Sequence, residues 1–198
     1  MAAIRLGDPA RDSRQVAAIY YPYVINTPVT FESDPPTGSE MSRRMEKVLE
    51  EYPWLICEEG QEIMGYSYGS RFRDRPAYDW IVETTIYVKE SAHGLGIGLA
   101  LYTSLIEYLR LQGYCSAVGV IALPNLPSIN LHERLGFKKC GLLANAGFKD
   151  GAWHTVGLWQ LTLQPNQDEP YPPIDFPATT HLAKFTTALK SGEPHLKF

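Results

Sequence analysis

Three glycines stand at alternate positions, Gly94, Gly96 and Gly98, just before a stretch with the apolar spacing of a helix. Glycines leave backbone N–H groups uncovered, and at the start of a helix these groups and the helix dipole together attract an anion such as phosphate. The loop is not a P-loop, because no Gly-Lys-Ser/Thr follows, and Leu99 occupies the place of the third glycine of a dinucleotide-binding loop. A glycine-rich turn that only packs a helix on a strand explains the loop about as often, so other residues must decide.

Two residues could transfer protons. Glu83 lies in the apolar run from Trp80 to Val88, where partial burial would raise the pKa of its carboxylate toward that of a general base. His132 lies in a predicted helix, four residues after Ser128 and therefore on the same face, and imidazole can donate or accept a proton near neutral pH. The alternatives are a strand carboxylate that faces solvent and a surface histidine.

Three arginines, Arg71, Arg73 and Arg75, stand close together in a chain whose formal net charge is −4. Arginine binds carboxylate or phosphinate groups through paired N–H donors, so these side chains could hold an anionic substrate. Aromatic residues that could form the walls of such a pocket are Phe31, Tyr78 and Trp153. The alternative is a solvated loop that includes Asp74.

The first half of the chain contains the patterns of two strands and two helices before the chemically interesting segment. A short apolar start at 3–6 predicts a strand, and apolar residues at helical spacing predict a helix that Asp12 or Ser13 caps and that stops at 26–28. A charged stretch at 39–50 with methionines on one side predicts a second helix. Residues 54–57 and 62–68 then predict a hairpin of two strands.

The second half places the candidate residues on strands and helices. It predicts a strand at 82–88, the glycine loop, a helix at 95–112 that ends at Gly113, and a strand at 117–121. Pro127 opens a further helix that Gly136 closes, and residues 148–159 predict a hairpin that turns at Asp150-Gly151. Helices between strands of one sheet indicate a mixed α/β domain that ends near Leu163.

Residues 165–198 differ in kind from the preceding 1–164, because prolines crowd a stretch with few core residues. Such a segment is expected to be extended rather than packed. Leu182, Phe185 and Leu189 could form one short helix, which is marginal in isolation. We therefore expect a mobile C-terminal tail, the alternative being that it packs on the domain or on a second subunit.

Composition argues against several classes of function. The negative net charge and the isoelectric point near 5.7 provide no general attraction for nucleic acid or anionic lipid. No apolar run approaches the roughly 20 residues of a membrane span, and the N-terminus lacks the order of a signal peptide. The three cysteines, Cys57, Cys115 and Cys140, have no metal-binding spacing, so we expect no metal site and a reducing, cytoplasmic location.

The order of motifs in the middle of the chain resembles the GNAT acetyltransferase superfamily. A strand ending in IYV, the loop HGLGIG, a helix and then ALPNLPSINLHERLGF resemble its acetyl-CoA core. More narrowly, the segments EYPWLICEE, AYDWIVETTIYV, LYTSLIEYLRLQGY and AGFKDGAWHTVGLWQL resemble the phosphinothricin N-acetyltransferases, over about residues 4–163. This resemblance implies a GNAT-type, mixed and mostly antiparallel sheet flanked by helices. It also implies an enzyme that transfers acetyl from acetyl-CoA to a small amine, and a homodimer.

The resemblance also implies roles for individual residues. It implies that Glu83 is the general base, that His132 acts as an acid or a second base, and that Asn125 bonds the pantetheine arm. Pantetheine would lie beside Ile86, Tyr87 and Val88, and the diphosphate would lie against Gly94, Leu95, Gly96, Ile97, Gly98 and Leu99. The resemblance supports Phe31, Arg73, Arg75 and Tyr78 as positions of the substrate pocket, whereas Trp153 is a candidate only because of its aromatic side chain.

The chain departs from the family pattern in the glycine loop. His93 stands where the family usually has Gln or Arg, and Gly94 replaces a common basic residue. These replacements should weaken cofactor binding without abolishing it, if backbone N–H groups are the main ligands of the diphosphate. For Asn125, the alternative to cofactor binding is a turn that starts the next helix.

Other functions remain open at this point. Within the enzymes, the substrate could be phosphinothricin, methionine sulfoximine, a polyamine or a protein N-terminus. A sensor that binds acetyl-CoA without turnover would keep the glycine loop but would not need Glu83 or His132. A Cys/His hydrolase is disfavoured, because none of the three cysteines lies at a strand-to-helix elbow.

Overall fold

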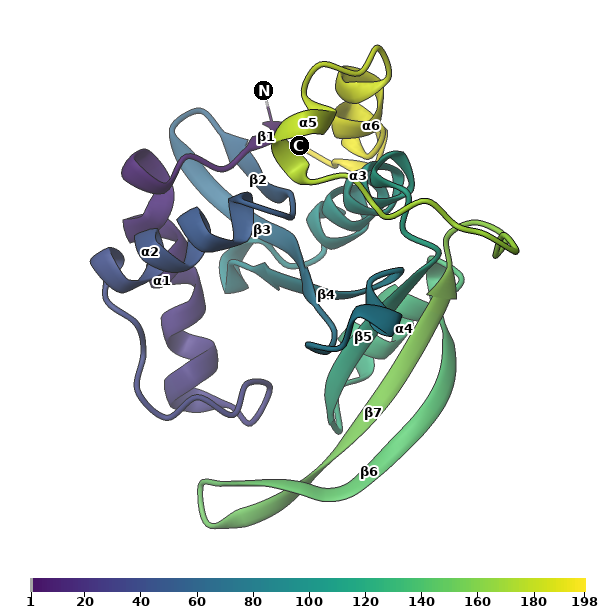
Figure 1. Cartoon of the computed structure of the whole chain (residues 1–198). Coiled ribbons are helices and arrows are strands. Elements are labelled where there is room, and N and C mark those ends of the chain that lie inside the picture. Colours follow the sequence, from purple (N-terminus) through teal and green to yellow (C-terminus); the bar gives the residue numbers. More distant parts are fainter. Residues whose placement is uncertain (1) are drawn as a thin grey trace.

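A computed structural model of the chain describes residues 2–198. Seven strands form one sheet in the order β1-β2-β3-β4-β5-β7-β6 (Figure 1). All neighbouring strands run antiparallel except β4 and β5, which are parallel. The strands are β1 (Ala2–Leu6), β2 (Trp54–Glu59), β3 (Glu62–Arg71), β4 (Ile81–Val88), β5 (Ser116–Leu123), β6 (Lys138–Lys149) and β7 (Ala152–Thr162). The predicted fold class, a mixed and mostly antiparallel sheet flanked by helices, is confirmed.

The helices pack on both faces of this sheet (Figure 1). They are α1 (Pro9–Asn26), α2 (Gly38–Leu49), α3 (Ile97–Gln112), α4 (Leu126–Arg134), α5 (Phe176–Thr179) and α6 (Phe185–Lys190). Single 3₁₀ turns occur at Pro76–Tyr78 (η1), Glu90–Ala92 (η2) and Glu193–His195 (η3).

Two predicted helix starts are wrong by a few residues. Helix α1 begins at Pro9 because Asp8 is its cap, accepting hydrogen bonds from the N–H groups of Ala10 and Arg11, and proline suits the first helical position. Asp12, one of the expected caps, is instead buried and paired with Arg5 at 2.6 Å. Helix α3 begins at Ile97 rather than residue 95, because Gly96 has a left-handed φ of 79°.

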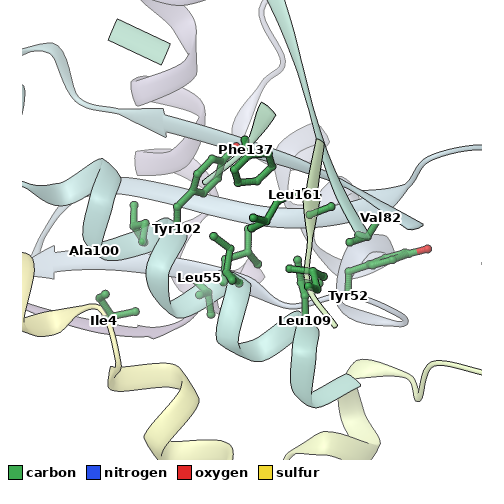
Figure 2. Packing of buried hydrophobic residues seen from close by; sticks show 14 of the residues in the cluster. Ile4, Tyr52, Leu55, Val82, Ala100, Tyr102, Leu109, Phe137 and Leu161 are labelled. Atoms are coloured by element: carbon green, nitrogen blue, oxygen red, sulfur yellow. The ribbon is translucent and has the colours of Figure 1, made fainter. Parts of the chain in front are cut away.

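Helix α3 forms the centre of the main core. Its predicted apolar stripe, Leu101, Leu105 and Leu109, is fully buried against the sheet, where it meets side chains such as Leu55 and Val82 (Figure 2). Helices α1 and α2 cover the opposite face over a stack of aromatic rings. The N-terminus of α3, and with it the glycine loop, is therefore held rigidly at the end of β4.

The C-terminal extension is not the mobile tail that its composition predicts. Phe176 and Leu189 are only 8% and 9% exposed, and the hydroxyl groups of Thr179 and Tyr108 are 2.6 Å apart. Helix α6 lies along α3 and beside β1 (Figure 1). Residues 165–173 form no helix or strand, but beyond them the chain buries enough apolar surface to dock, which is the expected alternative.

No helix among residues 2–198 is long and apolar enough to cross a membrane. The same residues hold no cluster of three or more His, Cys, Asp or Glu side chains that could bind a metal.

Candidate functional site

The site begins where the two parallel strands separate. Pairing between β4 and β5 ends at Thr84 and Gly119, although both strands continue. Beyond that point Ile86, Tyr87 and Val88 pair only with β3, so the edge of β4 that faces β5 is unpaired. The predicted unpaired segment is thus present. The Val88 carbonyl oxygen already accepts from the Tyr23 hydroxyl at 2.6 Å, but the other backbone groups on this edge can bond an extended ligand as a strand would.

A cleft with a cavity volume of about 220 Å³ occupies this gap. Residues from six parts of the chain line it: the loop after α1, strand β4, helix α3, strand β5, helix α4 with its cap, and strand β7. Its lining includes Phe31, Glu83, Thr84, Ile86, Tyr87, Tyr102, Val120, Asn125, Ser128 and His132. The cleft therefore contains both predicted proton-transfer residues.

Glu83 faces the cleft from the last paired part of β4. Burial raises the pKa of its carboxyl above the usual value, because the surroundings solvate the charged form poorly. No cation forms an ion pair with Glu83 among the described residues. A carboxylate in this environment is a stronger proton acceptor than an exposed one.

His132 is neutral and oriented. It is 2% exposed, and burial lowers its pKa. Its Nδ1 lies 2.8 Å from the carbonyl oxygen of Ser128, which can only accept, so Nδ1 carries the proton and Nε2 presents a lone pair. Nε2 is buried without a hydrogen-bond partner in residues 2–198, as expected of a group whose partner is a substrate or a water.

Two residues that the sequence reading missed fix this ring. The edge of the His132 ring meets the Tyr102 ring at 5.1 Å, and the Tyr102 hydroxyl donates to the carbonyl oxygen of Thr84 at 3.2 Å. Gly119 lies directly under the imidazole, so that a Cβ there would lie 2.6 Å from Cδ2 of His132. Nothing in the spacing of a single glycine in a strand signals such a contact.

The glycine loop provides the donors that an anion needs. Within residues 2–198, no hydrogen bond is donated by the N–H groups of Gly96, Ile97, Gly98 or Leu99, whereas Ala100 already donates to Gly96 O at 2.9 Å. On the Cβ side of Gly94 no atom lies within 4 Å. Free N–H groups at the start of a 16-residue helix fit a diphosphate.

Asn125 is both a cap and a cleft residue. Its Oδ1 accepts from the N–H of Ser128 at 3.2 Å, which is the helix-entry role weighed above. Its side chain also lines the cleft, and its amide NH₂ donates no hydrogen bond among the described residues. That amide remains available to a ligand.

The predicted substrate residues divide into two groups. Phe31 lines the cleft, with its ring 6.2 Å from that of His154. The structure does not place Arg73, Arg75, Tyr78 or Trp153 in the cleft lining: Arg73 lies 5.6 Å from the Tyr78 ring in the exposed β3–β4 loop, and Trp153 packs on Phe148 near the tip of the β6–β7 hairpin. Their substrate contacts stay a prediction.

Arg71 is no longer a candidate for binding an anionic substrate, because acidic side chains already pair with it. Its guanidinium pairs with Glu51 at 2.9 Å and Asp79 at 3.4 Å. Arg73 and Arg75 form no ion pair in the described part of the chain and are exposed. These two therefore keep free cationic groups in the loop that joins β3 to β4, the strand that carries Glu83.

Lys149 is a further residue that sequence reasoning missed. It is 7% exposed, and its Nζ donates to the carbonyl oxygens of Val24, Thr27 and Thr30 at 2.7–2.8 Å. These carbonyls belong to the end of α1 and to the segment that leads into Phe31. The lysine thus ties the β6–β7 hairpin to the loop that forms one wall of the cleft.

Comparisons with known proteins agree with this geometry. Residues 9–155 match the family model described as an acetyltransferase (GNAT) domain. A phosphinothricin N-acetyltransferase of Streptomyces viridochromogenes is 40% identical over 83% of this chain and 91% of its own length. An L-methionine sulfoximine/L-methionine sulfone acetyltransferase of Pseudomonas paraeruginosa is 31% identical over 78% of this chain and 91% of its own.

Among solved structures, a GNAT superfamily phosphinothricin acetyltransferase from Sinorhizobium meliloti, crystallised in complex with AcCoA, superimposes with a TM-score of 0.80. It is 34% identical and covers 88% of this chain and 98% of its own. The chain therefore belongs to the GNAT family and is an acetyl-CoA-dependent N-acetyltransferase.

Proposed function

We propose that this enzyme acetylates the primary amine of a small anionic amino-acid-like substrate, of the phosphinothricin or methionine sulfoximine type, with Glu83 as the general base. The observation that carries the proposal is the raised pKa of the Glu83 carboxyl in a cleft that opens between an unpaired strand edge and His132. Relatives named for these two substrates support the substrate class.

The chemistry requires a base because a protonated amine has no lone pair. Acetyl-CoA supplies the acetyl group as a thioester. Glu83 takes one proton from the ammonium group, and the freed nitrogen lone pair forms the new C–N bond while the C–S bond breaks. In this proposal an N–H of the Ile86–Val88 segment, whose edge toward β5 is unpaired, donates to the thioester oxygen as negative charge develops on it.

His132 acts as an acceptor before it acts as a donor. Since Nδ1 carries the proton in the neutral ring, Nε2 must first gain a proton before it can give one to the departing thiolate. The second proton that the nitrogen loses as the amide forms could supply it. This order removes two protons from nitrogen and returns one to sulfur, so that the products are a neutral amide and a thiol.

Moving His132 without changing it tests this role. Gly119→Ala introduces a Cβ that overlaps the imidazole, so the ring must shift away from the position that the Ser128 carbonyl and the Tyr102 ring define. We expect kcat to fall by about 10- to 100-fold, part of the contribution of one acid–base group. Gly141→Ala, whose Cβ would lie 3.2 Å from Leu158 Cδ1, is the matched control and should keep kcat. An unchanged kcat in a folded Gly119→Ala variant would remove His132 from the mechanism.

Substrate class can be tested by thiol release from acetyl-CoA across amino acids, phosphinothricin, methionine sulfoximine and uncharged amines. We expect the two anionic analogues to be acetylated with the highest kcat/KM.

Arg75→Gln should raise KM for the two anionic analogues by about 10-fold, as loss of a charge-assisted bond does, and leave KM for uncharged amines unchanged. Equal effects on both groups would place Arg75 outside the substrate site, and no thiol release with any amine would favour the sensor.

Two finer properties are part of the same proposal. The β6–β7 hairpin has an apolar surface formed by the exposed Leu142, Leu143, Phe148 and Trp153, which a homodimer would bury. Sedimentation at micromolar concentration should then show twice the chain mass.

The three free cysteines fit a cytoplasmic enzyme, which cell fractionation of the tagged chain would check.

A further inference from the structure

The last residues of the chain contact the glycine loop. The backbone N–H of Lys197 donates to the carbonyl oxygen of Leu95 at 3.0 Å. The carbonyl of His195 lies so close to Gly96 that any Cβ there would overlap it. The C-terminal extension therefore contacts the loop that is expected to hold the diphosphate.

This contact fixes the direction of one peptide group. In a trans peptide the C=O of Leu95 and the N–H of Gly96 point to opposite sides. Because Leu95 O is bonded to the tail, the Gly96 N–H points away from it, and that N–H has no other partner within residues 2–198. Without the tail, nothing described here would hold the peptide in this orientation, and Leu95 O would be free to accept the intrahelical bond from Leu99.

The C-terminal extension is itself anchored to α3 and to β1. Gly192 donates its N–H to Ser104 Oγ at 3.0 Å and packs so closely on Ala100 that no Cβ would fit. The Glu193 carboxylate accepts from the N–H of Ile4 at 3.1 Å, which joins the tail to β1. The chain end therefore contacts both α3 and β1 (Figure 1).

We propose that residues 193–198 position the diphosphate-binding loop: the Lys197 N–H holds the Leu95–Gly96 peptide so that the Gly96 N–H faces the diphosphate of coenzyme A. The inference rests on the proposed placement of the cofactor against this loop. The expected benefit is that pre-oriented N–H groups lose little freedom when the anion binds. These six residues are positioning residues and touch no reacting atom.

Two variants of one residue separate the backbone from the side chain. Lys197→Pro removes the N–H, at a site where the preceding Leu196 is already extended with ψ of 137°, as a residue before proline should be. Lys197→Ala keeps the N–H and removes the charge. Calorimetry should show the Kd of coenzyme A rising roughly 3- to 10-fold in Lys197→Pro, as expected for one lost hydrogen bond, and remaining within about twofold in Lys197→Ala.

A truncation after Gly192 provides an independent variant and should weaken coenzyme A binding at least as much. In all variants, KM for S-acetylpantetheine, which lacks the diphosphate, should remain unchanged, whereas a general loss of structure would raise it too. Melting temperatures check that each variant is folded.

Several results would overturn the inference. One is an unchanged Kd of coenzyme A in both Lys197→Pro and the truncation. Another is a rise of this Kd in Lys197→Ala as large as in Lys197→Pro, or a rise of KM for S-acetylpantetheine as large as the loss of coenzyme A binding. Tighter binding of coenzyme A after truncation would instead make the tail a competitor. Failure of the unaltered protein to bind coenzyme A would instead contradict the proposed cofactor site itself.

Discussion

Replacing Glu83 by Gln should lower kcat by about 10²- to 10⁴-fold, the range that general base catalysis contributes. The amide has nearly the shape of the protonated carboxyl but cannot accept the proton of the incoming ammonium group. Because Glu83 lies beside the unpaired end of β4 and not at the glycine loop, the KM for acetyl-CoA should change little. Steady-state thiol release at saturating acetyl-CoA and amine measures the effect, and Glu169→Gln, an exposed position in the extension, is the matched control.

Stability distinguishes this loss from unfolding. Burial raises the folded-state pKa of Glu83, so the protonated form stabilises the fold at low pH and this stabilisation is lost as the pH rises through the folded pKa. Gln resembles the protonated form at every pH. At pH 7 the melting temperature of the variant should therefore equal or exceed that of the unaltered enzyme. A clearly lower melting temperature would mean that the fall in kcat reflects loss of structure.

The pH profile gives a second readout of the same group. A base must be deprotonated to act, and the raised pKa moves the acidic limb of kcat/KM above the value of 4.5 that an ordinary glutamate would give. Burial lowers the pKa of His132, so protonation of this ring moves in the opposite direction, to lower pH than for an ordinary histidine. In Glu83→Gln the limb should disappear from the residual activity. Its persistence would assign the base role to another residue.

The sequence was most informative where local pattern and chemistry coincide. The apolar run around Glu83 and the glycines before α3 each follow from periodicity and backbone freedom, and the structure places the strand, the loop and the helix as these patterns predict. The sequence places His132 four residues after Ser128, on the same helix face. The structure shows a hydrogen bond at this separation, between Nδ1 of His132 and the carbonyl oxygen of Ser128. Local sequence separations of three or four residues carry such information because helix geometry is fixed.

Contacts between distant segments could not be predicted in this way. The docking of Lys197 on Leu95, and the position of Gly119 under His132, depend on how the strands and helices are arranged in space. Composition was misleading for the extension, because its prolines predict an open chain while only a few apolar residues, Phe176 and Leu189 among them, are enough to dock it. Tertiary packing overrides a weak local signal here.

Replacing Lys149 by Met should destabilise the fold. Three carbonyl oxygens share its Nζ, from Val24, Thr27 and Thr30. Lys149→Met keeps most of the apolar stem but leaves these acceptors without a donor. Since each buried polar group left unpaired costs about 1–3 kcal/mol and the loop can partly relax toward water, we expect a loss of roughly 2–4 kcal/mol in the free energy of unfolding. The melting temperature should fall by about 5–15 °C.

The same substitution should affect the two substrates differently. The segment that Lys149 holds leads into Phe31 and lines the cleft, whereas the glycine loop has supports of its own, such as the bond from the Lys197 N–H to Leu95 O. At a temperature where the variant is folded, KM for the amine should rise by several-fold more than KM for acetyl-CoA. Lys138→Met, an exposed lysine at the start of the same strand, should alter neither constant nor the melting temperature. Equal changes in both constants would mean that Lys149 stabilises the fold as a whole and does not shape the amine side of the cleft.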